Sequence, residues 1–314
     1  MTPFPRRLLQ EESLPGHRPT RRQHGKYPRN VKRVCFYHAG CPDGFGAAWA
    51  VRSAWGEDAY YVARHHEDRV NEDEWNDALV SFVDIAPGRD ELLELANSAA
   101  QVIVLDHHIT ALDRLTKDSS FIDDLETEGH VIHFDMHHSG AVLAWQFFRP
   151  DDPVPDLLRY VEDQDLWNWA LDDSDAINAA IASYPMDWET WTRLASQPIE
   201  RLAEQGAPIL RANRIEVERR VSHAKPVAIG TRRVEAVNAT NNRSQIGHEL
   251  AQRAAYGDPW GLVYRVEGVE VFGTLYSIGD FDVSKIAVTL GGGGHKNASG
   301  FRIGLEQWLS EFVI

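Results

Sequence analysis

The sequence feature that most constrains the fold is an apolar run that ends in a cluster of ionisable side chains. Residues 101–105 read Gln-Val-Ile-Val-Leu and are followed directly by Asp106-His107-His108. Short runs rich in β-branched residues are typical of buried strands, and parallel sheets place ligand sites at the carboxyl ends of strands. Carboxylate and imidazole groups together bind Mn²⁺, Fe²⁺ or Zn²⁺. The run therefore predicts a metal site, with a capped helix and surface histidines as the alternative.

Two more predicted strands end in the same chemistry. Residues 31–37 precede His38 and, after a glycine-containing turn, Asp43, while residues 79–83 precede Asp84. A single carboxylate in such a place could be a helix N-cap, and a single histidine could be structural. Capping explains all three strand ends poorly, so the pattern favours an α/β fold in which they share one edge of a parallel sheet.

The remaining pattern predicts further elements and a second region. Strands are expected at 58–63, 120–122 and 131–134, and helices from Ala47 onward and over 89–100, 141–148 and 157–161. Residues 209–221 form a charged connecting helix, and from 226 the expected strands are 227–229, 234–238, 261–266, 268–277 and 301–303. Helices are expected over 244–255 and 283–290. The four glycines at 291–294 can bring backbone N–H groups close to an anion, or else form a flexible loop.

Composition limits the classes of protein that this chain can belong to. A length of 314 residues suggests about two domains, and a net charge of −15 excludes a general binder of nucleic-acid backbone. Two cysteines make no disulfide framework, so we expect a cytoplasmic protein. We see no membrane span or secretory signal. Residues 1–30 are expected to be a disordered basic arm, either a plain tail or a nucleic-acid contact.

Taken in order, these motifs resemble the DHH phosphoesterase superfamily, in its branch with a C-terminal DHHA1 domain that includes nano-RNA hydrolases (oligoribonucleases). The resemblance covers residues 31–314. It implies a parallel-sheet DHH catalytic domain at 31–200 and a helical linker at 201–225. A smaller mixed α/β DHHA1 substrate-binding domain at 226–314 would face the first domain across a cleft.

The resemblance also implies roles for individual residues. Asp84 would bridge two metal ions, and His108 would meet the substrate phosphate, both as catalytic residues. The implied metal ligands are His38, Asp43, Asp84, His107 and Asp163. The substrate-binding residues would be His108, Arg243, Gly292, Gly293, Gly294, His295 and Lys296. The implied cofactor is Mn²⁺ in a two-metal site, with Mg²⁺ or Co²⁺ as alternatives.

The sequence departs from the family pattern in its first motif. The usual motif is Asp-x-Asp, and here Cys41 stands where the first Asp is expected. Cys41 could be a soft ligand, or the first metal site could be weak or use water. Asp163 is favoured over Asp165 as a ligand because it directly follows the apolar helix expected at 157–161.

The implied function is a metal-dependent phosphodiesterase, an exonuclease that cleaves short RNA or DNA oligonucleotides or dinucleotides to mononucleotides. Short substrates are favoured because the acidic chain has no visible basic track for a long strand. Hydrolysis of nucleoside 3′,5′-bisphosphates or cyclic dinucleotides is one alternative. Others are a pyrophosphatase or polyphosphatase and a non-catalytic nucleotide-binding protein. Whether the chain forms a homodimer is left open.

Overall fold

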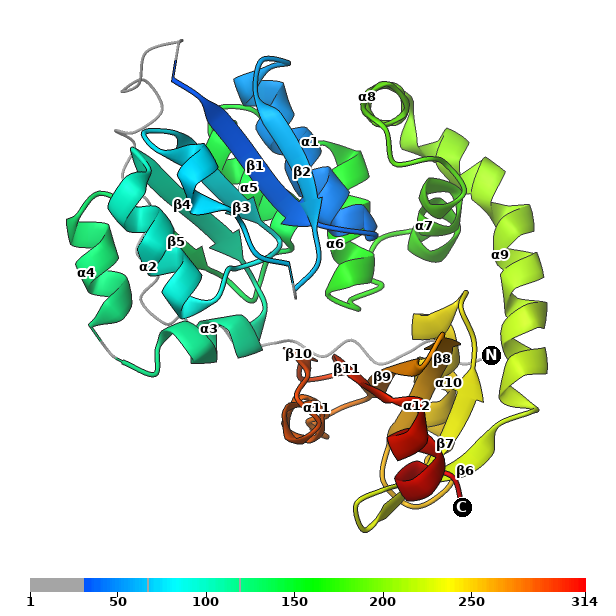
Figure 1. Ribbon diagram of the computed structural model, residues 1–314. Helices are drawn as coiled ribbons and strands as arrows, with labels where there is room; N and C mark the ends of the chain where they lie inside the picture. The colour runs from blue at the N-terminus through cyan, green and yellow to red at the C-terminus, as the bar shows by residue number, and fades with distance from the viewer. Residues whose placement is uncertain (1–30, 67, 119) are drawn as a thin grey trace.

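The computed structural model describes residues 31–66, 68–118 and 120–314, so the expected basic arm at 1–30 lies outside the described residues. Two units, each built on its own β-sheet, are joined by the long helix α9 (Ile199–Val221) (Figure 1). This helix covers most of the linker predicted at 201–225. The domain boundaries on either side of it remain predictions.

The first unit is built on a five-stranded parallel sheet with strand order β2-β1-β3-β4-β5. Its strands are β1 (Arg33–His38), β2 (Tyr60–Arg64), β3 (Leu79–Val83), β4 (Gln101–Asp106) and β5 (Val131–Phe134). Its helices are α1 (Pro42–Trp55), α2 (Arg89–Ser98), α3 (Ile109–Leu115), α4 (Phe121–Thr127), α5 (Gly140–Phe148), α6 (Asp156–Asp165), α7 (Ser174–Ala182) and α8 (Trp188–Ser196), with a 3₁₀ turn at Glu72–Trp75. The predicted α/β class with a parallel sheet is confirmed.

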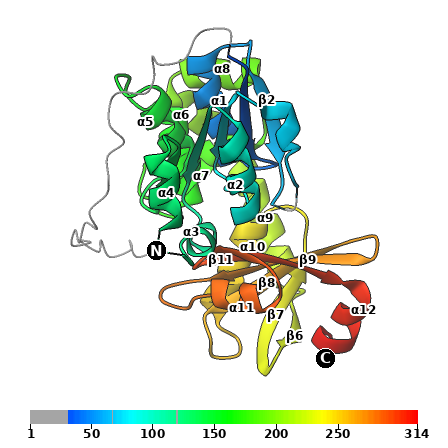
Figure 2. The same ribbon diagram turned by 60° about the vertical axis from the view of Figure 1, so that its left-hand side comes forward.

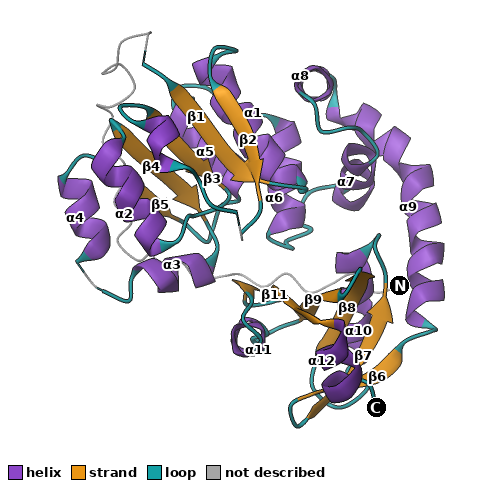
Figure 3. Cartoon of the chain, viewed as in Figure 1, coloured by secondary structure: helices purple, strands orange, loops and turns teal. Residues whose placement is uncertain are grey.

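Helices cover both faces of this sheet, as Figure 3 shows. Side chains alternate between faces along each strand. Cys35, Val83 and Leu105 therefore point into a core shared with α1, α5 and α6, whereas Phe36 and Phe82 join α2, α3 and α4 on the other face. Burial on both faces explains why the central strands read as continuous apolar runs.

The second unit holds a six-stranded mixed sheet with order β10-β11-β9-β8-β7-β6, in which only β7 and β8 pair in parallel. Its strands are β6 (Lys225–Ile229), β7 (Arg232–Asn238), β8 (Trp260–Glu267), β9 (Glu270–Ser277), β10 (Gly293–His295) and β11 (Ala298–Gly304). Its helices are α10 (Arg243–Arg253), α11 (Ser284–Thr289) and α12 (Leu305–Gln307), followed by a π turn at Trp308–Phe312. Helix α10 and the end of α9 pack on one face.

The two units meet where α3 contacts β10. Figure 2 shows the two units from a second side, with α3 close to the second sheet. The backbone N–H of Gly294 donates to Thr110 Oγ1 at 3.1 Å. The glycine-rich edge of the second sheet therefore lies directly over the carboxyl end of β4.

Three local predictions are wrong. The strand expected at 120–122 is the start of helix α4, because the buried Phe121 and Leu125 are four residues apart and share one helix face. Helix α1 begins at Pro42 rather than at Ala47, since proline at the first helical position suits a helix start. Helix α6 continues beyond Val161 to Asp165. Within the described part of the chain, no helix is long and apolar enough to span a membrane.

Candidate metal centre

The carboxyl ends of β1, β3 and β4 bring the predicted ligands together. His107 Nε2 lies 3.0 Å from Asp84 Oδ1 and 3.6 Å from Asp43 Oδ2. All three side chains are almost completely buried. The imidazole thus faces two carboxylates away from bulk water, which is the environment of a metal ligand set.

A second group of donors gathers on the other oxygen of Asp84. His38 Nδ1 lies 3.3 Å from Asp84 Oδ2, and Cys41 Sγ lies 3.5 Å from the same oxygen. Because Oδ1 faces His107 and Oδ2 faces His38 and Cys41, Asp84 stands between two clusters of ligand atoms.

The backbone around Asp84 is shaped for this close packing. Asp84 adopts a left-handed conformation with φ 59°, and a Cβ on Gly140 would lie 2.4 Å from the Asp84 Cβ. Only glycine fits at that position. The N–H groups of Gly140 and Ala141, in the first turn of α5, donate to the Asp43 carboxylate at 2.7 and 3.0 Å. The start of α5 therefore fixes the position of Asp43.

Asp165, rather than the Asp163 favoured from sequence, lies in the cluster. Asp165 Oδ2 lies 3.5 Å from His107 Nε2. The Asp163 carboxylate instead accepts hydrogen bonds from the N–H groups of Ala170 and Leu171 at 2.9 and 3.3 Å. Since α6 continues to Asp165, residues two apart point to different sides of the helix, and Asp163 holds the following turn.

The electrostatics of the cluster fit a bound cation. Burial and the neighbouring Asp84 and Asp165 raise the pKa of Asp43 well above its ordinary value. Burial opposes a charge on His107, but hydrogen bonding to Asp84 and the carboxylates of Asp165 and Asp43 raise its pKa to about 10. Burial likewise opposes ionisation of Asp84, yet hydrogen bonds from His107 and His38 keep its pKa well below the usual range. The protonated His107 imidazole thus places a positive charge among the carboxylates. A bound divalent cation would supply that charge in its place.

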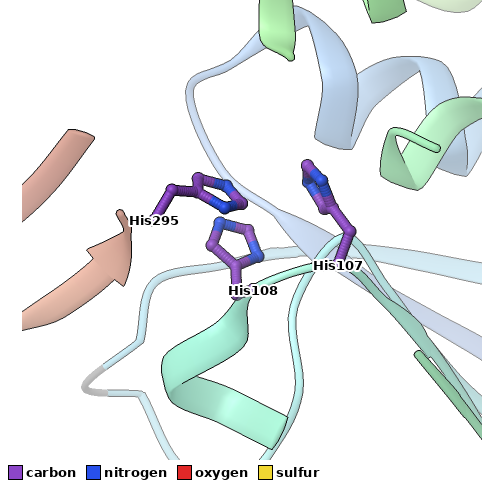
Figure 4. Close-up of side chains that lie close together, drawn as sticks. All are labelled: His107, His108 and His295. Atoms are coloured by element: carbon purple, nitrogen blue, oxygen red, sulfur yellow. The ribbon is translucent and has the colours of Figure 1, made fainter. Parts of the chain in front are cut away.

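His108 and His295 lie beside the cluster, where the second unit meets the first. His108 Nδ1 lies 2.7 Å from Asp106 Oδ1, and the two imidazole rings of His108 and His295 stack with centroids 4.4 Å apart. Figure 4 shows His295 reaching in from the second sheet toward His108, with His107 to the side. Burial lowers the tendency of His108 to protonate, but Asp106 outweighs it and raises the pKa of His108.

The glycine-rich segment forms a fixed strand rather than a flexible loop. Gly293 and Gly294 lie in β10, paired with β11, and a Cβ on Gly292 would lie 1.9 Å from the Gly300 carbonyl oxygen. Lys296 Nζ pairs with Asp280 at 2.9 Å beside the junction.

A cavity of about 870 Å³ opens beside the cluster. Its lining includes Trp167, His248 and Tyr276 together with Cys41, His295 and Lys296. Trp167 Nε1 donates to His248 Nδ1 at 3.1 Å, which joins the first unit to α10 of the second. Arg243, at the start of α10, lines a neighbouring cavity with Trp167 and Trp169.

Sequence reasoning missed three members of this region. His66, just beyond β2, places its ring 5.0 Å from that of His38 and 5.8 Å from that of His108. The other residues were predicted because each is an ionisable group that follows a strand, and His66 meets the same criterion. Trp167 and Tyr276 carry no comparable signal, because their approach depends on how the two units pack.

The fold is similar to that of a solved DHH domain. Among solved structures, the DHH domain of a member of the s1p family of ribosomal proteins matches with a TM-score of 0.54 at 15% identity, over 88% of this chain and 84% of that chain. The chain therefore has the DHH-type fold that its motifs predict.

Two curated proteins are similar to this chain in sequence. An uncharacterized protein of Acanthamoeba polyphaga mimivirus is 28% identical over 85% of this chain and 66% of its own length. The oligoribonuclease NrnB of Bacillus subtilis (strain 168) is 23% identical over 83% of this chain and 70% of its own length. The chain thus spans about two thirds of the length of these relatives, and no family model matches it. What is confirmed is the DHH-type fold that the motifs predict.

Proposed function

We propose that this protein is a divalent-cation-dependent phosphodiesterase that hydrolyses dinucleotides or short oligonucleotides. The observation that carries the proposal is the position of Asp84, with one oxygen 3.0 Å from His107 and the other 3.3 Å from His38. A buried carboxylate between two sets of donors fits a pair of cations. His107, Asp43 and Asp165 would hold one cation, His38 would hold the other, and Asp84 would contact both.

When bound, divalent cations such as Mn²⁺ offset phosphate charge and lower the pKa of water. The chain's own residues would position the substrate. Asp106 accepts hydrogen bonds from the backbone N–H groups of His107 and His108 at 2.7 and 3.3 Å, so its carboxylate is fixed. It holds the His108 ring through Nδ1, which leaves Nε2 to donate to a phosphate oxygen or to protonate the leaving oxygen.

The second unit would select the substrate. His295 and Lys296 line the cavity, where a terminal phosphate of the substrate would meet them. Trp167 and Tyr276 supply aromatic surface on which a nucleobase can stack. A cavity of about 870 Å³ lies in the range of small-ligand sites, so it suits one or two nucleotides better than a long strand. The similarity to an oligoribonuclease supports this choice.

The test measures product formation from a 5′-labelled dinucleotide, a longer single-stranded RNA and pyrophosphate, with Mn²⁺ and with chelator. We expect the dinucleotide to be cleaved fastest, and only with the cation. His108→Ala should lose this activity, whereas His137→Ala, at an exposed histidine, should retain it. If only pyrophosphate is hydrolysed, the proposed dinucleotide substrate is contradicted. If no substrate is hydrolysed, a non-catalytic nucleotide-binding protein is favoured.

A further inference from the structure

We propose that Cys41 is a ligand of the first cation site, together with His38 and Asp84, and that its thiolate makes this site select Zn²⁺ over Mg²⁺. The inference rests on the proposed function in that it concerns the same two-cation centre. It assigns the position where the usual carboxylate of the first motif is replaced by a thiol.

The separations of the three donor atoms suit a tetrahedral cation. Cys41 Sγ lies 3.4 Å from His38 Nδ1 and 3.5 Å from Asp84 Oδ2, and the latter two atoms are 3.3 Å apart. Ligands about 2.0–2.3 Å from a tetrahedral zinc ion lie about 3.3–3.6 Å from one another. The three side chains therefore form one triangular face of such a site as they stand.

Helix capping alone does not explain a cysteine here. Cys41 is the N-cap of α1, and its Sγ accepts a hydrogen bond from the Gly44 N–H at 3.2 Å. Ser, Thr, Asp and Asn are the preferred N-cap residues. The chain uses Ser139 to cap α5 and Asp187 to cap α8. A sulfur atom at Cys41 adds little as a cap, but it adds a soft donor beside His38 and Asp84.

The loop that carries His38 and Cys41 is held in place. Pro42 follows Cys41 and favours the extended conformation that Cys41 adopts, with φ −129° and ψ 151°. A Cβ on Gly44 would lie 2.1 Å from the His38 carbonyl oxygen, so the turn closes tightly on the end of β1. Both donors are thus fixed relative to each other without a metal.

The two sites differ in their donor chemistry. The second site contains His107 with the carboxylates of Asp43 and Asp165, an oxygen-rich set that suits Mn²⁺ or Mg²⁺. The first contains sulfur, nitrogen and one carboxylate oxygen, and thiolate and imidazole favour Zn²⁺. On binding, the Cys41 thiol loses its proton to the buffer and its sulfur coordinates the cation.

The test uses Co²⁺ as a spectroscopic substitute for Zn²⁺. Titration of the metal-free full-length protein should give a near-ultraviolet thiolate-to-cobalt charge-transfer band, which Zn²⁺ abolishes and Mg²⁺ does not. Cys35→Ala should keep the band, because Cys35 is buried in the sheet. Cys41→Ser should lose it, with circular dichroism confirming the fold. Absence of the band in the wild type, or its survival in Cys41→Ser, would overturn the inference.

A second variant measures selectivity. Cys41→Asp restores a carboxylate and should still bind two cations, but its Zn²⁺-to-Mg²⁺ affinity ratio should fall at least about tenfold, since even outer-shell changes cost about 10–100-fold in metal affinity. An unchanged ratio would contradict the proposal. Dinucleotide turnover with Mn²⁺ is measured separately. A cobalt–thiolate band without dinucleotide turnover would support Cys41 as a ligand and contradict the proposed phosphodiesterase function. Turnover without the band would support that function and contradict the assignment of Cys41.

Discussion

The imidazole rings of His295 and His108 stack across the junction of the two units, with ring planes inclined by 25°. His108 is fixed by Asp106 in the first unit, while His295 is carried by β10 of the second. The contact places the glycine-rich strand beside the cluster of candidate metal ligands, so a disturbance of β10 should reach the proposed substrate site.

Gly292→Ala tests this connection. The added Cβ would lie 1.9 Å from the Gly300 carbonyl oxygen and should push β10 off β11, displacing His295. We expect kcat/KM for the dinucleotide to fall about 100-fold, as a displacement of about 1 Å at a reacting site can cost. Gly304→Ala in the same sheet is the control, because its Cβ would meet open space. Equal activity of the two variants would count against the connection.

Trp167→Ala should weaken binding of substrates that carry a base. Loss of one stacking platform costs about 1–3 kcal/mol, so KM for a dinucleotide should rise about 5- to 150-fold. Pyrophosphate has no base to stack, and any inhibition by it should change little. Steady-state kinetics with competition by pyrophosphate measures both effects. An equal change for the two ligands would mean that Trp167 acts only through its bond to His248.

Glu91→Ala should destabilise the first unit. Glu91 receives two hydrogen bonds from Arg64, at 3.0 and 2.7 Å, and both side chains are buried. Removing one partner leaves a buried unpaired charge and costs about 3–5 kcal/mol. Glu94→Ala, in the same helix, removes only an exposed pair with Arg69 and should cost less than about 1 kcal/mol. Urea unfolding compares the variants, and similar midpoints would contradict the expectation.

His138 should contribute stability that depends on pH. Its hydrogen bond to Glu162, at 3.1 Å, raises the pKa of His138 above its ordinary value. The contribution is therefore complete below the unfolded value of about 6.5 and is lost as pH rises through the higher folded pKa. His138→Gln should lose more stability near pH 5.5 than near pH 9 when unfolding is measured with chelator present. A larger loss of stability near pH 9 than near pH 5.5 would contradict the predicted direction of the pH dependence.

Much of the fold could be predicted from sequence, because strong local patterns coincide with the structure. The apolar runs before His38, Asp84 and His107 are three adjacent parallel strands, and adjacency at their carboxyl ends gathers the cluster. The prediction of a strand at 120–122 is wrong because a short apolar run does not distinguish the 3.6-residue period of a helix from the two-residue period of a strand.

The rest of the site depends on geometry that sequence does not encode locally. Asp165 and Asp163 lie in different places because α6 extends about one turn further than its apolar residues indicate. The meeting of Trp167 with His248, and of His108 with His295, depends on how α9 sets the second unit against the first. No pattern within either segment predicts such a contact.

The most direct test of the central claim is bound cation and dinucleotide turnover measured on the same samples of wild type, Asp84→Asn and Asp124→Asn. Asp124 lies exposed on α4 and serves as the control. We predict that Asp84→Asn loses bound cation and loses turnover by more than the roughly 100-fold cost of an outer-shell change, while Asp124→Asn matches the wild type. Full metal-dependent turnover by Asp84→Asn would contradict the account.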